Sequence, residues 1–211
     1  MRKRNLPAEV GDLADTTVMD SRGAVTSIQS ATVNISRDGL ERIWSATWLE
    51  RLARTYWRHI TRVTLGLIRV AYREDGRDVV LIAKPFKLLS FSAPEYEISP
   101  QAGTVTWRIA GGLLVSNPGE GLLRIKVERL GEPGTGGPDP ASVRVDVEVS
   151  NFYPAIAHSI SKHLYQWTQS KIHVIVTYGF LRSLAKGDLA ESKAKRFAPE
   201  GDGGGQPARP A

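Results

Sequence analysis

The most constraining feature of this sequence is a strict alternation of valine with polar residues. Val143, Val145, Val147 and Val149 occupy every second position, and serine, arginine, aspartate and glutamate lie around and between them. Because successive side chains of a strand point to opposite faces, this segment predicts a strand with one buried and one solvated face. Any fold for the chain therefore places this strand in a sheet that covers an apolar core.

Shorter apolar runs predict the rest of an antiparallel sheet. We expect these strands over residues 31–35, 63–73, 78–84, 88–99, 104–116 and 122–130. Turn-forming residues separate the runs, and Asp75 followed by Gly76 is the strongest hairpin signal because glycine accepts a positive φ. With the valine strand, these runs predict a curved sheet of about seven strands.

Two short helices are predicted after the first strand. Asp38 followed by Glu41 resembles a capping box at a helix start. An apolar residue then recurs at every fourth position: Leu40, Trp44, Trp48, Leu52, Tyr56 and Ile60. Such a row drifts about 40° at each step and sweeps about 200° in all, so one straight helix cannot bury it. Two helices bent against each other can bury it.

A long amphipathic helix is predicted near the C-terminus. Pro154 suits the first turn of a helix and precedes the segment 156–185. Six residues of that segment fall within a stripe of about 60° on a helix. They are Ile156, Ile160, Trp167, Val174, Tyr178 and Leu181. The β-branched residues in 172–177 also suit a strand, so that alternative stays open there.

The predicted fold class is therefore α+β, with a curved antiparallel sheet, two short helices after strand 1 and a long C-terminal helix. Residues 1–28 are polar and aperiodic, which predicts a flexible N-terminal arm. Residues 29–186 form the folded domain, and residues 187–211, rich in glycine and proline near their end, predict a disordered tail.

Composition excludes several classes of protein. The formal net charge is +6, but the arginines are scattered and alternate with apolar residues on the predicted strands, which does not favour nucleic acid as a partner. The sequence has no cysteine, which fits a reducing, cytoplasmic location. The most apolar run, 172–181, is too short for a membrane span. The four histidines form no zinc-binding pair on a helix, so we expect no metal and no cofactor.

Three short segments carry a family resemblance. They are Ile43 with Trp44 early in the first helix, residues 107–112 in a central strand, and residues 147–154 before the last helix. In this order of elements, the chain resembles the START-like (SRPBCC) superfamily, which includes polyketide cyclases and lipid-transfer domains. The resemblance implies a helix-grip fold whose sheet and closing helix enclose a cavity for a sterol, lipid, polyketide or hormone-like ligand. The tight hairpin at Gly76 departs from the glycine-rich loop of the pollen-allergen branch and argues against hormone binding.

Eight residues are candidates for binding a ligand: Tyr56, His59, Tyr96, Trp107, His163, Trp167, Lys171 and Tyr178. The aromatic residues either line a cavity or belong to the core. His163 lies near the apolar stripe of the predicted last helix. It is a candidate general base or ligand contact, and the alternative is a structural histidine. Lys171 lies at the edge of that stripe, where its ammonium group either reaches solvent or binds a ligand carboxylate.

Three hypotheses for function stay open. The first is a protein that binds or transfers a hydrophobic small molecule, lipid-like or polyketide-like. The second is an enzyme of the cyclase, aromatase or dehydratase type, in which groups such as Tyr96, His59 and His163 move protons. The third is a protein-interaction scaffold that recruits partners through the basic arm and the tail. The sequence fixes neither the catalytic residues, if any, nor the oligomeric state.

Overall fold

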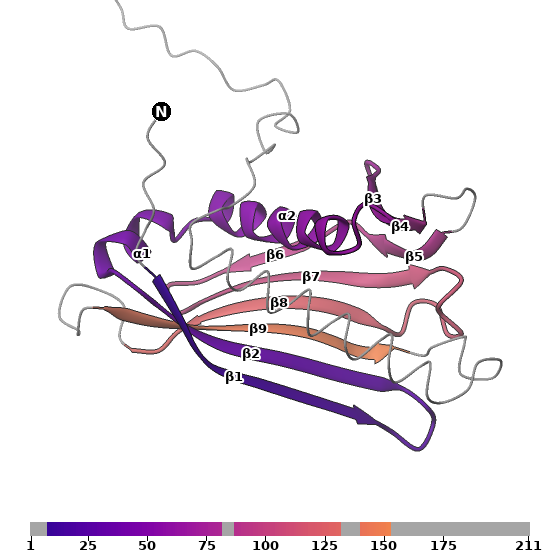
Figure 1. Cartoon of the computed structure of the whole chain (residues 1–211), viewed down its shortest axis with the longest axis horizontal. Helices are drawn as coiled ribbons and strands as arrows, with labels where there is room; N and C mark the ends of the chain where they lie inside the picture. Colours follow the sequence, from indigo (N-terminus) through magenta and orange to yellow (C-terminus); the bar gives the residue numbers. More distant parts are fainter. Residues whose placement is uncertain (1–7, 82–86, 132–139, 153–211) are drawn as a thin grey trace, which may run out of the picture.

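The computed structural model describes residues 8–81, 87–131 and 140–152, which form one antiparallel sheet and two helices (Figure 1). The elements are β1 (Ala8–Met19), β2 (Val25–Ile35), α1 (Arg37–Ile43), α2 (Ala46–Val63), β3 (Ile68–Tyr72), β4 (Gly76–Leu81), β5 (Lys87–Ser92), β6 (Glu95–Ile98), β7 (Ala102–Gly111), β8 (Leu122–Arg129) and β9 (Ala141–Phe152). The strand order is β1-β2-β9-β8-β7-β5-β4-β3, and β6 also pairs with β7. The two helices lie between β2 and β3 in sequence.

The valine strand is confirmed as β9, which pairs with β2 on one side and β8 on the other. Val143, Val145 and Val147 are buried, whereas Arg144 is exposed. Val147 lies opposite Ile125 of β8, and both side chains are fully buried. The alternation therefore identifies the two faces of the sheet correctly. The face that carries these valines is called the inner face.

Helix α2 packs on the inner face. It contacts β3, β6 and β7 (Figure 1). Leu49 of α2 lies against Gly103 of β7, where an added Cβ would be 3.6 Å from the leucine side chain. The rings of Trp57 on α2 and Trp107 on β7 are 5.2 Å apart, edge to face. Such aromatic contacts add to the stability gained by burying apolar area.

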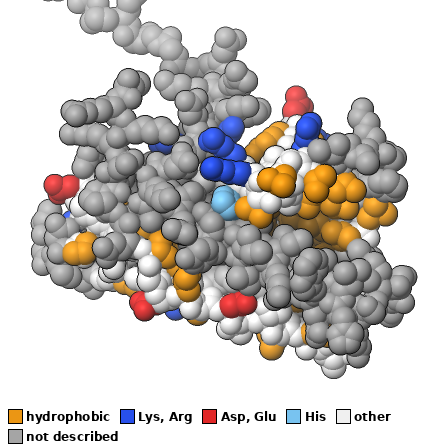
Figure 2. Space-filling view, in the orientation of Figure 1, with side chains coloured by type: hydrophobic (Ala, Val, Ile, Leu, Met, Phe, Trp, Pro, Cys, Tyr) orange, Lys and Arg blue, Asp and Glu red, His pale blue; other side chains and the backbone are white. Residues whose placement is uncertain are grey.

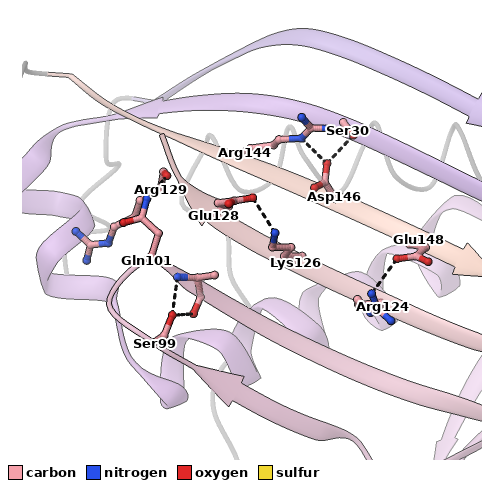
Figure 3. Close-up of polar contacts among 11 residues, drawn as sticks. Ser30, Ser99, Gln101, Arg124, Lys126, Glu128, Arg129, Arg144, Asp146 and Glu148 are labelled. Atoms are coloured by element: carbon pink, nitrogen blue, oxygen red, sulfur yellow. Dashed lines mark hydrogen bonds and ion pairs between the residues drawn. The ribbon is translucent and has the colours of Figure 1, made fainter. Parts of the chain in front are cut away.

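The outer face carries polar side chains that pair across and along the strands (Figure 3). Three ion pairs lie there: Arg124–Glu148 at 3.4 Å, Lys126–Glu128 at 2.8 Å and Arg144–Asp146 at 2.9 Å. Asp146 and Glu148 point away from the valines, as the alternation predicts. Each is half-buried beside an arginine rather than simply solvated.

The fold class predicted from the sequence is wrong. The described residues form nine strands, not about seven, and α2 is a helix of 18 residues rather than a short one. The run 88–99 divides into β5 and β6 on either side of Ala93 and Pro94, because proline donates no hydrogen bond to a strand ladder. The described part of the chain contains no long C-terminal helix, and the segment 156–185 lies outside it.

The additional strand is β1, in a region that the sequence assigns to a flexible arm. Residues 8–19 pair with β2, so the arm interpretation is wrong for this segment. The register shifts between Gly11 and Ala14, where Asp12 has a φ of 49°, and this bulge breaks the polar alternation. Most of β1 is exposed, as befits an edge strand. The tail assigned to 187–211 lies outside the described residues.

The two helices separate at Ser45, as the drifting apolar row requires. The Ser45 side chain accepts a hydrogen bond from the backbone N–H of Trp48 and caps α2. The predicted capping box is wrong. Ser36, not Asp38, occupies the N-cap position of α1, and its side chain makes no capping hydrogen bond, while Glu41 binds the buried guanidinium of Arg129. That guanidinium also lies 4.3 Å from the ring centre of Trp44 and so ties the α1 region to β8.

Neither helix of the described residues is both long and apolar enough to cross a membrane. From Glu50 onward charged residues recur along α2, and buried side chains such as Leu49, Leu52 and Tyr56 face the sheet.

Replacement of Asp78 by asparagine is expected to destabilise the protein at neutral pH and to have less effect in acid. Asp78 is buried on β4 and pairs with Lys87 at 3.0 Å and with Arg73 at 3.5 Å. Burial alone would raise its pKa, but hydrogen bonds from Lys87 and Ser90 and the charges of Arg73 and Lys87 lower the pKa below 3.8.

A carboxyl group with a lowered folded-state pKa contributes stability that is present above its unfolded pKa and is lost as the pH falls. The difference in unfolding free energy between wild type and Asp78→Asn should therefore be about 1–3 kcal/mol at neutral pH and shrink below about pH 4. Urea unfolding at a series of pH values measures it. A difference that stays constant from neutral pH into acid would contradict the prediction.

Candidate functional site

One row of side chains crosses the inner face from β2 to β7. Gln29 lies opposite Val147, Val147 opposite Ile125, and Ile125 opposite Val105. Directly paired residues of an antiparallel sheet point to the same face. The row therefore places a primary amide beside three apolar side chains that are each fully buried.

The amide of Gln29 is the unusual group in this row. The residue is only 5% exposed, and neither its Oε1 nor its Nε2 has a hydrogen-bond partner among the described residues. By contrast, the hydroxyl of Ser27, the next inward-facing residue of β2, forms a 2.9 Å hydrogen bond with the hydroxyl of Thr17 on β1. A buried polar group without a partner costs about 1–3 kcal/mol, so Gln29 is a strong candidate for contact with a bound molecule.

Four aromatic rings form a cluster between α2 and the sheet. Trp57 lies 5.3 Å from Tyr56, 5.2 Å from Phe91 and 5.2 Å from Trp107, measured between ring centres. We call these residues the aromatic cluster. The indole N–H groups of both tryptophans are buried and find no acceptor among the described residues. Within the described structure, the cluster thus offers two unpaired donors in an apolar surrounding.

Two of the predicted site residues, Tyr56 and Trp107, meet in the aromatic cluster through Trp57. Burial strongly raises the pKa of Tyr56, so its hydroxyl does not ionise at neutral pH. Its neighbours on α2 and the sheet are mostly apolar. Tyr56 is therefore suited to a hydrogen bond or a packing contact and not to the role of a general base.

The other predicted site residues do not join this cluster in the described structure. His59 is half-buried, and burial together with the charge of Arg62 lowers its pKa, so the ring is neutral at neutral pH. Tyr96 lies on β6 opposite Val105 and is 38% exposed. The remaining four, His163, Trp167, Lys171 and Tyr178, lie outside the described residues.

Sequence reasoning missed Gln29 and Trp57. Gln29 shares the strand face of Ala31 and Val33, and an amide at a core position of an alternating strand is the signal that could have identified it. Trp57 falls outside the four-residue row of α2 but faces Phe91. Both residues matter because of what lies across from them, which the spacing along one element does not reveal.

The described residues contain no group of three or more histidine, cysteine, aspartate or glutamate side chains placed to hold a metal ion. The inner face instead combines apolar side chains with a few hydrogen-bonding groups, which is the usual make-up of a small-molecule site.

An antiparallel sheet with a helix on its inner face and a few buried, unsatisfied polar groups describes a class of protein but no one family. No protein-family model, no curated protein and no solved structure matches the chain. Membership of the START-like superfamily accordingly stays a hypothesis that rests on the sequence.

Proposed function

We propose that the protein binds a hydrophobic small molecule, lipid-like or polyketide-like, on the inner face of the sheet. The observation that carries the proposal is the Gln29 amide, buried in an apolar row with no partner for either polar atom among the described residues. A ligand carbonyl or hydroxyl that pairs with this amide recovers the free energy lost by burying it. The ligand class is therefore an apolar molecule with at least one hydrogen-bonding group.

Two further features support the proposal. The row from Gln29 to Val105 crosses three strand spacings, about 14 Å, which suits a medium-length acyl chain or a fused-ring molecule. The aromatic cluster adds two indole donors beside this row. Burying an apolar ligand here contributes about 25 cal/mol for each Å² removed from water. Within the described residues, no observation favours the cyclase or the scaffold alternative over simple binding.

Native mass spectrometry of the full chain, purified from its own host, tests the proposal directly. We expect a mass above that of the polypeptide, and a released molecule that partitions into organic solvent. In parallel, anilinonaphthalene sulfonate should gain fluorescence with the folded protein and lose it when the extracted ligand is added. A bare polypeptide mass, together with no probe binding, would sink the proposal.

Replacement of Gln29 by leucine tests the hydrogen-bonding role of the amide separately from the space that the side chain fills. Leucine keeps the size of the side chain and removes the unsatisfied polar atoms, so the unliganded protein should become more stable by about 1–3 kcal/mol. Affinity for the extracted ligand should fall about tenfold, because the polar contact is lost. Urea unfolding and ligand titration by tryptophan fluorescence measure the two effects.

The control is Thr32→Val, which makes a similar polar-to-apolar change on the same strand. Thr32 lies opposite Arg144, on the outer face. The Thr32→Val substitution should leave ligand affinity unchanged. Equal affinities for wild type and Gln29→Leu would remove the amide from the site.

A further inference from the structure

A second cluster lies on the inner face at the β3–β4 hairpin. Tyr72 lies opposite Arg77 across β3 and β4, and Arg77 lies opposite Phe91 across β4 and β5. Phe91 in turn packs on Trp57. The arginine is therefore the direct neighbour of the aromatic cluster on the same face of the sheet. Figure 2 shows that hydrophobic side chains gather over the part of the molecule where β3, β4 and β5 lie in Figure 1.

Two positive charges converge on the ring of Tyr72. The guanidinium carbon of Arg77 lies 4.8 Å from the ring centre, and that of Arg54, which reaches down from α2, lies 5.8 Å from it. A tyrosine ring attracts a cation, but two guanidinium groups around one ring repel each other. This arrangement is stable when negative charge is supplied nearby.

The negative charge within the cluster does not balance the two arginines. Glu50 lies 3.7 Å from Arg54, one turn away on the same helix. Among the described residues, no carboxylate forms an ion pair with Arg77, whose closest polar contact is a 3.4 Å hydrogen bond to the Gly76 carbonyl. The Nε atoms of both arginines are also shielded from water with no partner in the described part of the chain. Among residues 8–81, 87–131 and 140–152, the cluster thus has two guanidinium groups and one carboxylate.

Two partly exposed tyrosines, Tyr72 and Tyr96, lie on the solvent side of the cluster. Tyr72 is 50% exposed, and Tyr96 lies on the inner face of β6, close enough to Arg77, Glu50 and Arg54 for their charges to act on its hydroxyl. Burial raises the pKa of both phenols, so both hydroxyls stay protonated hydrogen-bond donors at neutral pH. A ligand group that enters here meets two guanidinium groups and two hydroxyls that can donate hydrogen bonds, and one carboxylate, Glu50.

We propose that Arg77 and Arg54, flanked by the hydroxyls of Tyr72 and Tyr96, bind the carboxylate of an amphipathic ligand whose apolar chain lies against Phe91 and the aromatic cluster. The guanidinium fork matches a carboxylate with two parallel hydrogen bonds. A single negative charge balances the one excess positive charge, whereas a dianionic phosphate would exceed it. The inference rests on the proposed function and specifies the ligand as an apolar acid.

The experiment compares two probes that differ only in the head group, dodecanoate and dodecanol, with the full-length protein. Titration calorimetry at neutral pH gives each affinity. We expect wild type to bind the acid about tenfold more tightly than the alcohol. Arg77→Gln should lose that preference and keep its affinity for the alcohol. Arg77→Lys should keep part of the preference, because the charge remains and the fork is lost.

The matched control is Arg69→Gln, on the same hairpin. Arg69 is exposed and lies one residue out of phase with Val70 and Tyr72, hence on the outer face. The Arg69→Gln variant should prefer dodecanoate over dodecanol as strongly as wild type does. Equal binding of acid and alcohol by wild type, or a preference that survives in Arg77→Gln, would overturn the carboxylate site and leave the proposed function standing. Failure of wild type to bind either probe would instead count against the proposed function.

Discussion

Replacing Gly76 with alanine is expected to lower the free energy of unfolding by more than about 3 kcal/mol. An added Cβ would overlap the carbonyl oxygen of Phe91 and lie 3.2 Å from its carbon, with the Arg73 side chain 2.8 Å away on another side. Gly76 pairs with Ser92, so the obstruction comes from the neighbouring strand backbone, which cannot rotate aside. Alanine would therefore force β4 away from β5.

Urea unfolding monitored by tryptophan fluorescence measures the loss. The control is Gly11→Ala, because Gly11 also lies in a strand, also lacks a positive φ and has no atom within 4 Å of an added Cβ. That change should alter stability by less than about 0.5 kcal/mol. Similar effects of the two substitutions would show that the close approach of β4 to β5 is not what requires glycine.

Gly76 illustrates what local sequence patterns could and could not predict. Asp75 and Gly76 do mark the hairpin, and the backbone N–H of Arg73 donates to the Gly76 carbonyl at 2.9 Å. The predicted reason is wrong, because Gly76 does not have a positive φ. Glycine is required there by the distance to Phe91, a residue of the next strand. Pairing between strands sets that distance, and no local pattern contains it.

The same limit explains the fold prediction. Alternation predicts β9 and its two faces, and an apolar run bounded by turn residues predicts β8. Alternation does not predict β1, because its bulge at Asp12 disrupts the pattern and because little of an edge strand is buried. The division of β5 from β6 follows from Pro94, but the apolar run 88–99 that contains Pro94 predicts one continuous strand.

The candidate sites were harder to predict than the strands. The buried spacing of aromatic residues makes Tyr56 and Trp107 candidates, and the structure joins them through Trp57. The scattered arginines of the sequence predict a solvated Arg77, yet the register places it between Tyr72 and Phe91 on the inner face. A binding group that is assembled from four separate elements leaves no motif in the sequence.

Replacing Trp107 with alanine should cost about 3–5 kcal/mol of unfolding free energy, since the side chain is fully buried and the change leaves a cavity against Trp57. Trp48→Ala is the control: Trp48 is half-buried and stacks on Trp44, 6.3 Å away, so its loss should cost clearly less. Urea unfolding measures both. Equal losses for the two variants would mean that Trp107 is not a central packing residue.

Trp107→Phe tests the donor rather than the packing. Phenylalanine retains much of the ring and removes an indole N–H that has no acceptor among the described residues. Stability should therefore change by less than about 1.5 kcal/mol, because the smaller ring is offset by the loss of an unsatisfied donor. If that N–H donates to the ligand, affinity for the extracted ligand should fall about tenfold. Unchanged affinity would assign Trp107 to the core alone and leave Gln29 as the polar contact.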